Sequence, residues 1–133
     1  LEAHAVVDNL LGNKEATVDY TGIPSAVFTL PPLARVGLLE AEAKQQGLRF
    51  KVKHESVSGW FTARRVNESC YGYKVLVEEG SGRILGAHLI GPEAAEVINL
   101  FGFAMRSGLG ADAIRHATFA YPTAASDIES MLP

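Results

Sequence analysis

Two apolar segments joined by a short glycine-containing turn limit the possible folds of this chain strongly. The segments run from Tyr73 to Glu78 and from Arg83 to Ile90, on either side of Glu79-Gly80-Ser81-Gly82. Apolar runs of this length around a loop with glycine are typical of a β-hairpin. Because the second segment has little polar surface, we expect it near the centre of a sheet.

The rest of the sequence predicts further strands and several helices. Apolar and basic side chains alternate from Leu48 to Val57, as in a half-solvated strand. Two more strands are predicted at Pro24 to Thr29 and Ala34 to Leu38. Helices are predicted at Leu1 to Lys14, Leu39 to Gln46, Glu93 to Ser107, Ala111 to His116 and Ser126 to Leu132. This order predicts an α+β fold, a mostly antiparallel sheet with helices packed against one face.

The helix predicted from Glu93 to Ser107 is apolar on more than one side. Its polar residues form only a narrow stripe, namely Glu93, Glu96, Asn99 and Arg106. A surface helix of a monomer normally has one apolar face. We therefore expect this helix to contact both its own sheet and a second copy of the chain. Such a symmetric homodimer, formed with help from the final segment, would cover an otherwise exposed apolar patch.

Composition and charge exclude several classes of protein. A formal net charge of -3 and a pI near 5.8 leave no basic excess to neutralise phosphates, so no nucleic-acid partner is expected. No apolar run approaches the ~20 residues that cross a bilayer, and no signal-peptide pattern opens the chain, so no membrane contact is expected. The single cysteine, Cys70, excludes an internal disulfide. These features predict a soluble, cytoplasmic protein.

The usual catalytic and metal-binding patterns are weak in this sequence. The loops Gly80-Ser81-Gly82 and Gly108-Leu109-Gly110 do not open a helix after a parallel strand, which argues against phosphate binding. No metal-ligand spacing connects the four histidines, which are His4, His54, His88 and His116. His88 is interpreted as a hydrogen-bonded sheet residue. Cys70 has no neighbouring base to activate it and is interpreted as a small buried residue.

The stretch from Phe119 to Glu129 gathers an aromatic residue, a proline, hydroxyls and acids. It places Tyr121 and Pro122 in a turn that leads into the last predicted helix. One interpretation is a proline turn with Thr123 or Ser126 as the helix cap, and spacing alone favours it. The other is that Pro122 holds Tyr121 toward a site on another domain or subunit.

Three ordered motifs resemble a known family. The segment from Ile23 to Ala43 (IPSAVFTLPPLARVGLLEAEA) resembles the opening of the C-terminal dimerisation domain of pyridine nucleotide-disulfide oxidoreductases. Glutathione reductase, dihydrolipoamide dehydrogenase and mercuric reductase belong to this group. Gly82 to Pro92 (GRILGAHLIGP) is similar to its central strand, and Tyr121-Pro122-Thr123 falls where the family carries His-Pro-Thr. By this resemblance, residues 1–17 are the tail of a preceding flavin domain and residues 18–133 are the dimerisation domain.

The resemblance implies a longer parent enzyme, with a flavin domain and a nicotinamide domain before this one. The absence of an initiator methionine at Leu1 also suggests a piece of something longer. FAD and NAD(P)H would belong to the parent, and electrons would pass from nicotinamide to flavin, to a cysteine pair, and then to substrate. With neither a dinucleotide fingerprint nor a cysteine pair, this chain is expected to bind no cofactor and to lack activity by itself. A cis bond is expected at Tyr121-Pro122, and also considered at Leu30-Pro31.

The resemblance also implies that Tyr121 and Pro122 face the flavin of the partner subunit. The family's acid–base pair is a His followed five positions later by Glu, and here Tyr121 and Ser126 occupy these positions. A phenol stays protonated at neutral pH, so it can donate a proton but is a poor base. We expect Tyr121 to orient substrate or protonate a leaving group, with Ser126 offering a neutral hydrogen bond. The alternative is a structural homodimer module of a flavoprotein that has lost disulfide chemistry.

Overall fold

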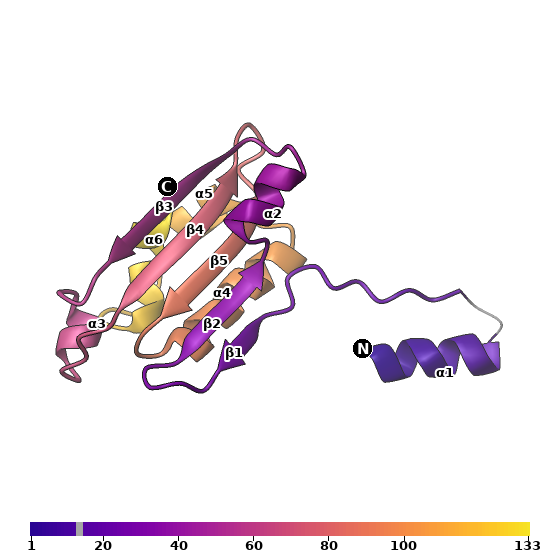
Figure 1. Ribbon diagram of the computed structural model, residues 1–133, viewed down its shortest axis with the longest axis horizontal. Coiled ribbons are helices and arrows are strands. Elements are labelled where there is room, and N and C mark those ends of the chain that lie inside the picture. The colour runs from indigo at the N-terminus through magenta and orange to yellow at the C-terminus, as the bar shows by residue number, and fades with distance from the viewer. Residues whose placement is uncertain (13–14) are drawn as a thin grey trace.

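A five-stranded antiparallel sheet organises the chain in the computed structural model, which describes residues 1–12 and 15–133 (Figure 1). Its strands are β1 (Ser25–Val27), β2 (Leu33–Gly37), β3 (Phe50–Ser56), β4 (Gly72–Glu78) and β5 (Ile84–Ile90). They lie in the order β1-β2-β5-β4-β3, and each neighbouring pair is antiparallel. The predicted fold class is confirmed, and β5 is the central strand, as its apolar sequence indicated.

The predicted hairpin joins β4 to β5. The amide of Glu78 donates to the carbonyl oxygen of Arg83 at 2.8 Å and closes the turn. Gly80 and Gly82 have φ angles of 85° and 69°, a region that glycine occupies without the steric cost of a Cβ atom. The two glycines that indicated the turn in the sequence are therefore required by its geometry.

The helices lie mainly on one face of the sheet. They are α1 (Glu2–Gly12), α2 (Glu40–Gln45), α3 (Phe61–Arg64), α4 (Ala94–Arg106), α5 (Ala111–Arg115), the 3₁₀ turn η1 (Ala124–Asp127) and α6 (Ile128–Met131). In Figure 1, α4, α5 and α6 lie behind the sheet and α2 lies in front of it. The predicted helices are confirmed, except that residues 13 and 14 lie outside the described residues. The one-turn helix α3 was not predicted.

The expectation that helices cover only one face of the sheet is wrong. Ala43 of α2 is fully buried against Leu76 and Leu85, whose side chains point to the face opposite α4. The backbone at Leu38, between β2 and α2, lies close against β5 because Gly86 has no side chain. A Cβ atom at Gly86 would collide with the carbonyl oxygen of Leu38. The helix α2 therefore forms a short second layer on this face, where β5 carries a glycine.

The main core lies between the sheet and α4. Inward-facing residues of the strands and of α4 form it, including Val36, Val75, Leu89, Ile98 and Phe101. On α4, the buried residues Val97, Phe101 and Ala104 recur at helical spacing and define the face toward the sheet. The opposite side of α4 carries Leu100, which is half-buried, and Phe103, which is 66% exposed. The other exposed residues of α4 are the polar Glu96, Asn99 and Arg106. The expected second apolar side is therefore reduced to Phe103 and Leu100 within a polar surface.

The N-terminal helix α1 stands apart from the sheet (Figure 1). None of its residues is buried. The segment after it is linked to it by a hydrogen bond from the Tyr20 hydroxyl to Glu2 Oε1 at 2.8 Å. In the described part of the chain, no helix is long and apolar enough to cross a membrane.

Candidate functional site

The turn that carries Tyr121 lies between α5 and η1. The Tyr121–Pro122 and Leu30–Pro31 peptide bonds are both cis, as expected. The Tyr121 side chain is 84% exposed. Across residues 1–12 and 15–133, no other group forms a hydrogen bond with its hydroxyl. The phenol is therefore free of hydrogen bonds within the described part of the chain.

Ser126 is engaged within its own turn. Its hydroxyl donates to the carbonyl oxygen of Thr123 at 2.6 Å, and the amide of Thr123 donates back to Ser126 Oγ at 3.4 Å. Thr123 stands at the N-cap position of η1, as the cap interpretation placed it, but its side chain makes no cap hydrogen bond. The hydrogen bonds of Ser126 in the described structure go to Thr123, and none goes to Tyr121.

Asp127 follows Ser126 and points toward the body of the domain. Its Oδ2 accepts a hydrogen bond from Thr62 Oγ1 at 2.6 Å and another from the Tyr71 hydroxyl at 3.1 Å. Burial, together with the nearby carboxylate of Asp127, raises the pKa of Tyr71 well above its usual value. These two partners were missed by sequence reasoning, because they lie 65 and 56 residues away along the chain.

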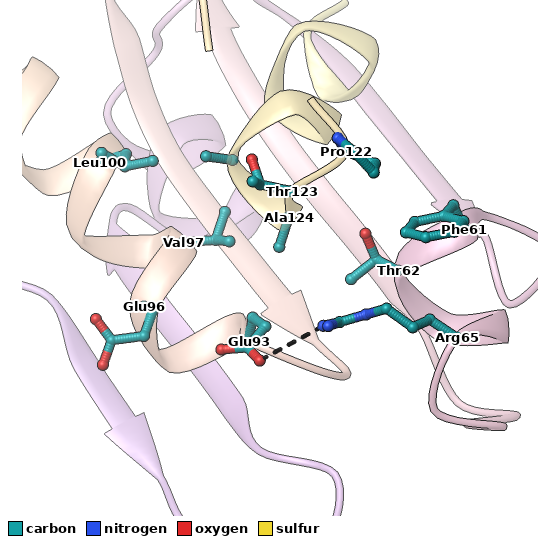
Figure 2. Close-up of a pocket in the computed structure, with 11 residues that line it drawn as sticks. Phe61, Thr62, Arg65, Glu93, Glu96, Val97, Leu100, Pro122, Thr123 and Ala124 are labelled. Carbon is teal, nitrogen blue, oxygen red and sulfur yellow. Dashed lines mark ion pairs between the residues drawn. The ribbon is translucent and has the colours of Figure 1, made fainter. Parts of the chain in front are cut away.

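A pocket of about 350 Å³ opens beside the turn. It lies between α3, the first turns of α4 and the residues that follow Tyr121 (Figure 2). Figure 2 shows Arg65 extending from α3 toward Glu93, with which it forms an ion pair at 4.0 Å. Leu100 lines the pocket and also belongs to the outward side of α4. A chain bound on that side of α4 would therefore also border the pocket and the turn.

The chemistry available at this turn is that of a proton or hydrogen-bond donor. The phenol of Tyr121 is accessible, whereas the carboxylate of Asp127 is occupied by two hydroxyls. No group of three or more His, Cys, Asp or Glu side chains in the described residues is arranged to hold a metal ion.

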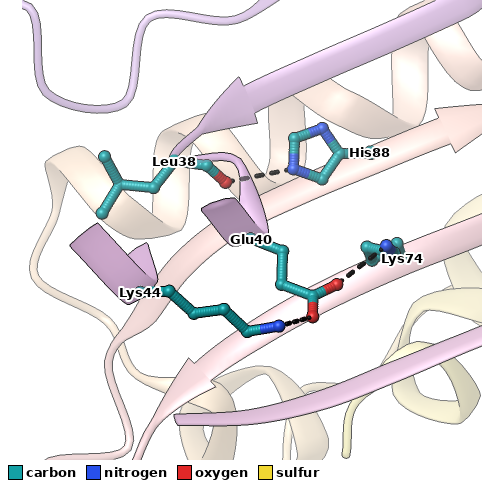
Figure 3. A network of polar contacts seen from close by, with 5 residues as sticks. All are labelled: Leu38, Glu40, Lys44, Lys74 and His88. Atoms are coloured by element: carbon teal, nitrogen blue, oxygen red, sulfur yellow. Dashed lines mark hydrogen bonds and ion pairs between the residues drawn. The ribbon is translucent and has the colours of Figure 1, made fainter. Parts of the chain in front are cut away.

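Cys70 and His88 both lie away from this turn. Cys70 is exposed, so its interpretation as a buried residue is wrong. It lies in the loop before β4, where its amide donates to Glu68 Oε1 at 2.8 Å. His88 is a hydrogen-bonded sheet residue, as interpreted, because its Nε2 lies 3.1 Å from the carbonyl oxygen of Leu38 (Figure 3). Burial lowers the pKa of His88.

Glu40 lies on the same face of the sheet and is paired with two lysines (Figure 3). Its carboxylate accepts hydrogen bonds from Lys44 Nζ at 2.7 Å and Lys74 Nζ at 3.0 Å. These contacts, that of Lys44 first, lower the pKa of Glu40 from 4.5 to about 2. Because this pKa lies below that of the unfolded chain, the pairing stabilises the fold above about pH 4.5. The stabilisation is lost as the pH falls toward 2.

We expect Glu40→Gln to make unfolding less dependent on pH in this window. The urea midpoints at pH 6 and pH 2.5 should differ less in the variant than in the wild type. Glu79→Gln is the matched control, because Glu79 is exposed and forms no ion pair with any described residue. An identical pH dependence in Glu40→Gln and in the wild type would contradict the stabilising role of this pair.

Comparison with known proteins identifies the family. Residues 23–132 match the family described as pyridine nucleotide-disulphide oxidoreductase, dimerisation domain. The match includes the whole sheet, α4 and the Tyr121 turn. The chain belongs to this family, and the resemblance read from its three motifs is confirmed.

Relatives of this chain include flavoprotein reductases. It is 48% identical over 98% of its length to an uncharacterized 19.7 kDa protein in a mercuric resistance operon of Staphylococcus aureus, and covers 73% of that protein. It is 34% identical over 93% of its length to mercuric reductase of Streptomyces lividans, and covers 26% of it.

A solved structure confirms the fold. The HOCl-induced flavoprotein disulfide reductase RclA from Escherichia coli matches 97% of this chain with a TM-score of 0.85 and 30% identity. The match covers 30% of the RclA chain. This chain therefore spans between a quarter and a third of the length of the two reductases.

Proposed function

We propose that this chain is the dimerisation domain of a flavin-dependent NAD(P)H oxidoreductase and contributes Tyr121 to the active site of the partner subunit. The family match over residues 23–132 supports the domain assignment. The exposure of Tyr121 at the tip of its turn is the observation that carries the site assignment. A side chain this exposed, with no hydrogen bond to any described residue, is available to a second subunit. Residues 1–17 then form the tail of a preceding flavin domain, which is consistent with α1 having no buried residue in this chain.

The outward side of α4 is the proposed dimer contact. Phe103 is exposed there beside the half-buried Leu100. In a symmetric dimer the same surface patch meets its own copy, so both copies of Phe103 would be covered. The C-terminal segment, η1 and α6, exposes less apolar surface to a partner, because Ile128 and Met131 are fully buried in the core of their own chain. Its contribution to the contact would therefore come from the Tyr121 turn.

FAD and NAD(P)H are proposed as cofactors of the parent enzyme. The described residues fit a flavin as an edge contact, since Tyr121 and Pro122 lie on an exposed turn. The flavin, when bound, supplies the redox chemistry. This chain adds the phenol of Tyr121, a donor that can orient a substrate or give a proton to a leaving group. By itself the chain is expected to show no turnover.

The connection between β1 and β2 offers a second apolar surface. Phe28 is 90% exposed and Leu30 is 99% exposed. Large apolar side chains gathered in this way mark surfaces that another domain or protein covers. We assign this surface to the flavin and nicotinamide domains of the same parent chain, because α4 already provides the contact with the second copy.

Phe103→Glu is expected to make the chain monomeric at concentrations where the wild type is dimeric. In a symmetric contact the substitution would place two carboxylates against each other in a desolvated surface. Phe103 is outside the core, so the melting temperature of the monomer should stay near that of the wild type. Sedimentation velocity measures the association, and Val7→Glu on α1 is the control for an added surface charge. A Phe103→Glu variant that remains dimeric would contradict this contact.

A structural homodimer module without disulfide chemistry is the second candidate. It is favoured by the Ser126 hydroxyl, whose hydrogen bonds go to Thr123 rather than Tyr121. The 19.7 kDa relative is also matched over 73% of its length, so most of that protein is this domain. The sequence upstream of Leu1 distinguishes the two candidates. A cysteine pair after a dinucleotide fingerprint would support the reductase, and its absence would support the module.

A further inference from the structure

We propose that Thr62, Tyr71 and Asp127 form a positioning cluster that fixes the Tyr121 turn on the body of the domain. The proposal rests on the proposed role of Tyr121, because the place of this turn matters only if its side chain meets a second subunit. These three residues act through the backbone of the turn and are positioning residues, with no contact to substrate.

The geometry of the cluster is that of a carboxylate shared by two buried hydroxyls. Asp127 Oδ2 accepts from Thr62 Oγ1 at 2.6 Å and from the Tyr71 hydroxyl at 3.1 Å. Thr62 and Tyr71 are each only 3% exposed. A buried hydroxyl that loses its hydrogen-bond acceptor lowers the stability of the fold. The Asp127 carboxylate is therefore favoured at this one position. Trp60 packs edge-on against the Tyr71 ring, with 6.0 Å between centroids, and limits its movement.

The cluster is the first polar link between the turn and the rest of the domain. Thr123 and Ser126 bond to each other, which shapes the turn without attaching it to the sheet. The Thr123 hydroxyl donates to Ala120, again within the turn. Along the described chain after Tyr121, Asp127 is the first residue whose side chain bonds to a distant element. Further attachment begins only with Ser130, whose carbonyl accepts from a lysine of β3.

The same cluster also connects two elements that line the pocket beside the turn. Thr62 comes from α3, and Pro122 and Thr123 come from the turn (Figure 2). The hydrogen bond from Thr62 to Asp127 joins α3 to the segment that continues from the turn. Loss of the cluster would therefore free both the turn and the pocket wall against which a partner subunit would dock.

Two variants separate positioning from stability. Asp127→Leu leaves two buried hydroxyls without an acceptor, so it should both lower the urea midpoint and loosen the turn. The triple variant Thr62→Val, Tyr71→Phe, Asp127→Leu removes the donors as well, and replacing all partners by apolar groups can be nearly neutral for stability. We expect the triple variant to regain most of the urea midpoint while the turn stays loose.

The measurement is ¹⁵N relaxation of the backbone amides of Ala120, Tyr121 and Thr123. In the wild type we expect order parameters of about 0.85, and in both cluster variants values below about 0.6. Val36→Ala is the matched control, because it destabilises the core at β2, far from the turn, and should leave these order parameters unchanged.

The proposal is overturned if the triple variant regains the wild-type order parameters along with its stability. It is equally overturned if Val36→Ala loosens the turn as much as Asp127→Leu does. The relaxation measurement does not depend on enzyme activity. Failure of the positioning proposal can therefore be told apart from failure of the proposed function. That failure would appear as unchanged activity after substitution of Tyr121 itself.

Discussion

Tyr121→Phe in the proposed parent enzyme is expected to lower turnover about 100-fold while reduction of the flavin by NAD(P)H stays intact. The substitution removes one hydroxyl and keeps the ring and the turn. That hydroxyl has no hydrogen-bond partner within the described chain, so its loss should not unfold the domain. The effect would fall on the step in which substrate is oriented or a leaving group is protonated.

Stopped-flow absorbance separates these two half-reactions. Flavin reduction is followed first without acceptor, and steady-state turnover is then measured with the true electron acceptor. Tyr20→Phe is the comparison at a second exposed tyrosine, away from the turn. It removes a hydrogen bond to Glu2 and should still leave turnover unchanged. Unchanged turnover in Tyr121→Phe would make Tyr121 a packing residue and would favour the structural module.

Phe101→Ala is expected to lower the free energy of unfolding by about 3–5 kcal/mol. Phe101 is fully buried between α4 and the sheet, so truncation leaves a cavity in the main core. Phe103→Ala, two residues further along the same helix, should change it by less than about 0.5 kcal/mol in the monomer. Urea unfolding at concentrations below those of dimer formation measures both. Equal losses at the two positions would contradict the orientation of α4.

Periodicity and turn chemistry predicted most of the fold. The glycines around Ser81 indicated the central hairpin because their positive φ angles are what the turn needs. Alternation between apolar and basic side chains predicted β3, and helical spacing predicted α4. The four-residue helix α3 was not predicted, because it is too short for apolar residues to repeat at helical spacing. The placement of α2 on the second face depends on the bare backbone at Gly86, which is a tertiary effect.

The candidate site was predicted only in part. The residue pattern around Tyr121 and Pro122 identified the turn, and the family resemblance implied its cis bond. The partners of Asp127 were not predicted, because Thr62 and Tyr71 are brought to it by packing between distant elements. Cys70 was interpreted as buried because cysteine usually is, but its position in a loop between α3 and β4 leaves it exposed.

The mass of the chain in solution tests the central claim that this domain pairs two copies of itself. Static light scattering over a concentration series reports this mass directly. We expect it to rise with concentration to twice the 14.2 kDa of one chain. The Phe103→Glu variant should stay at the mass of one chain in the same series. A wild-type mass that remains that of a single chain at the highest concentration would contradict the account.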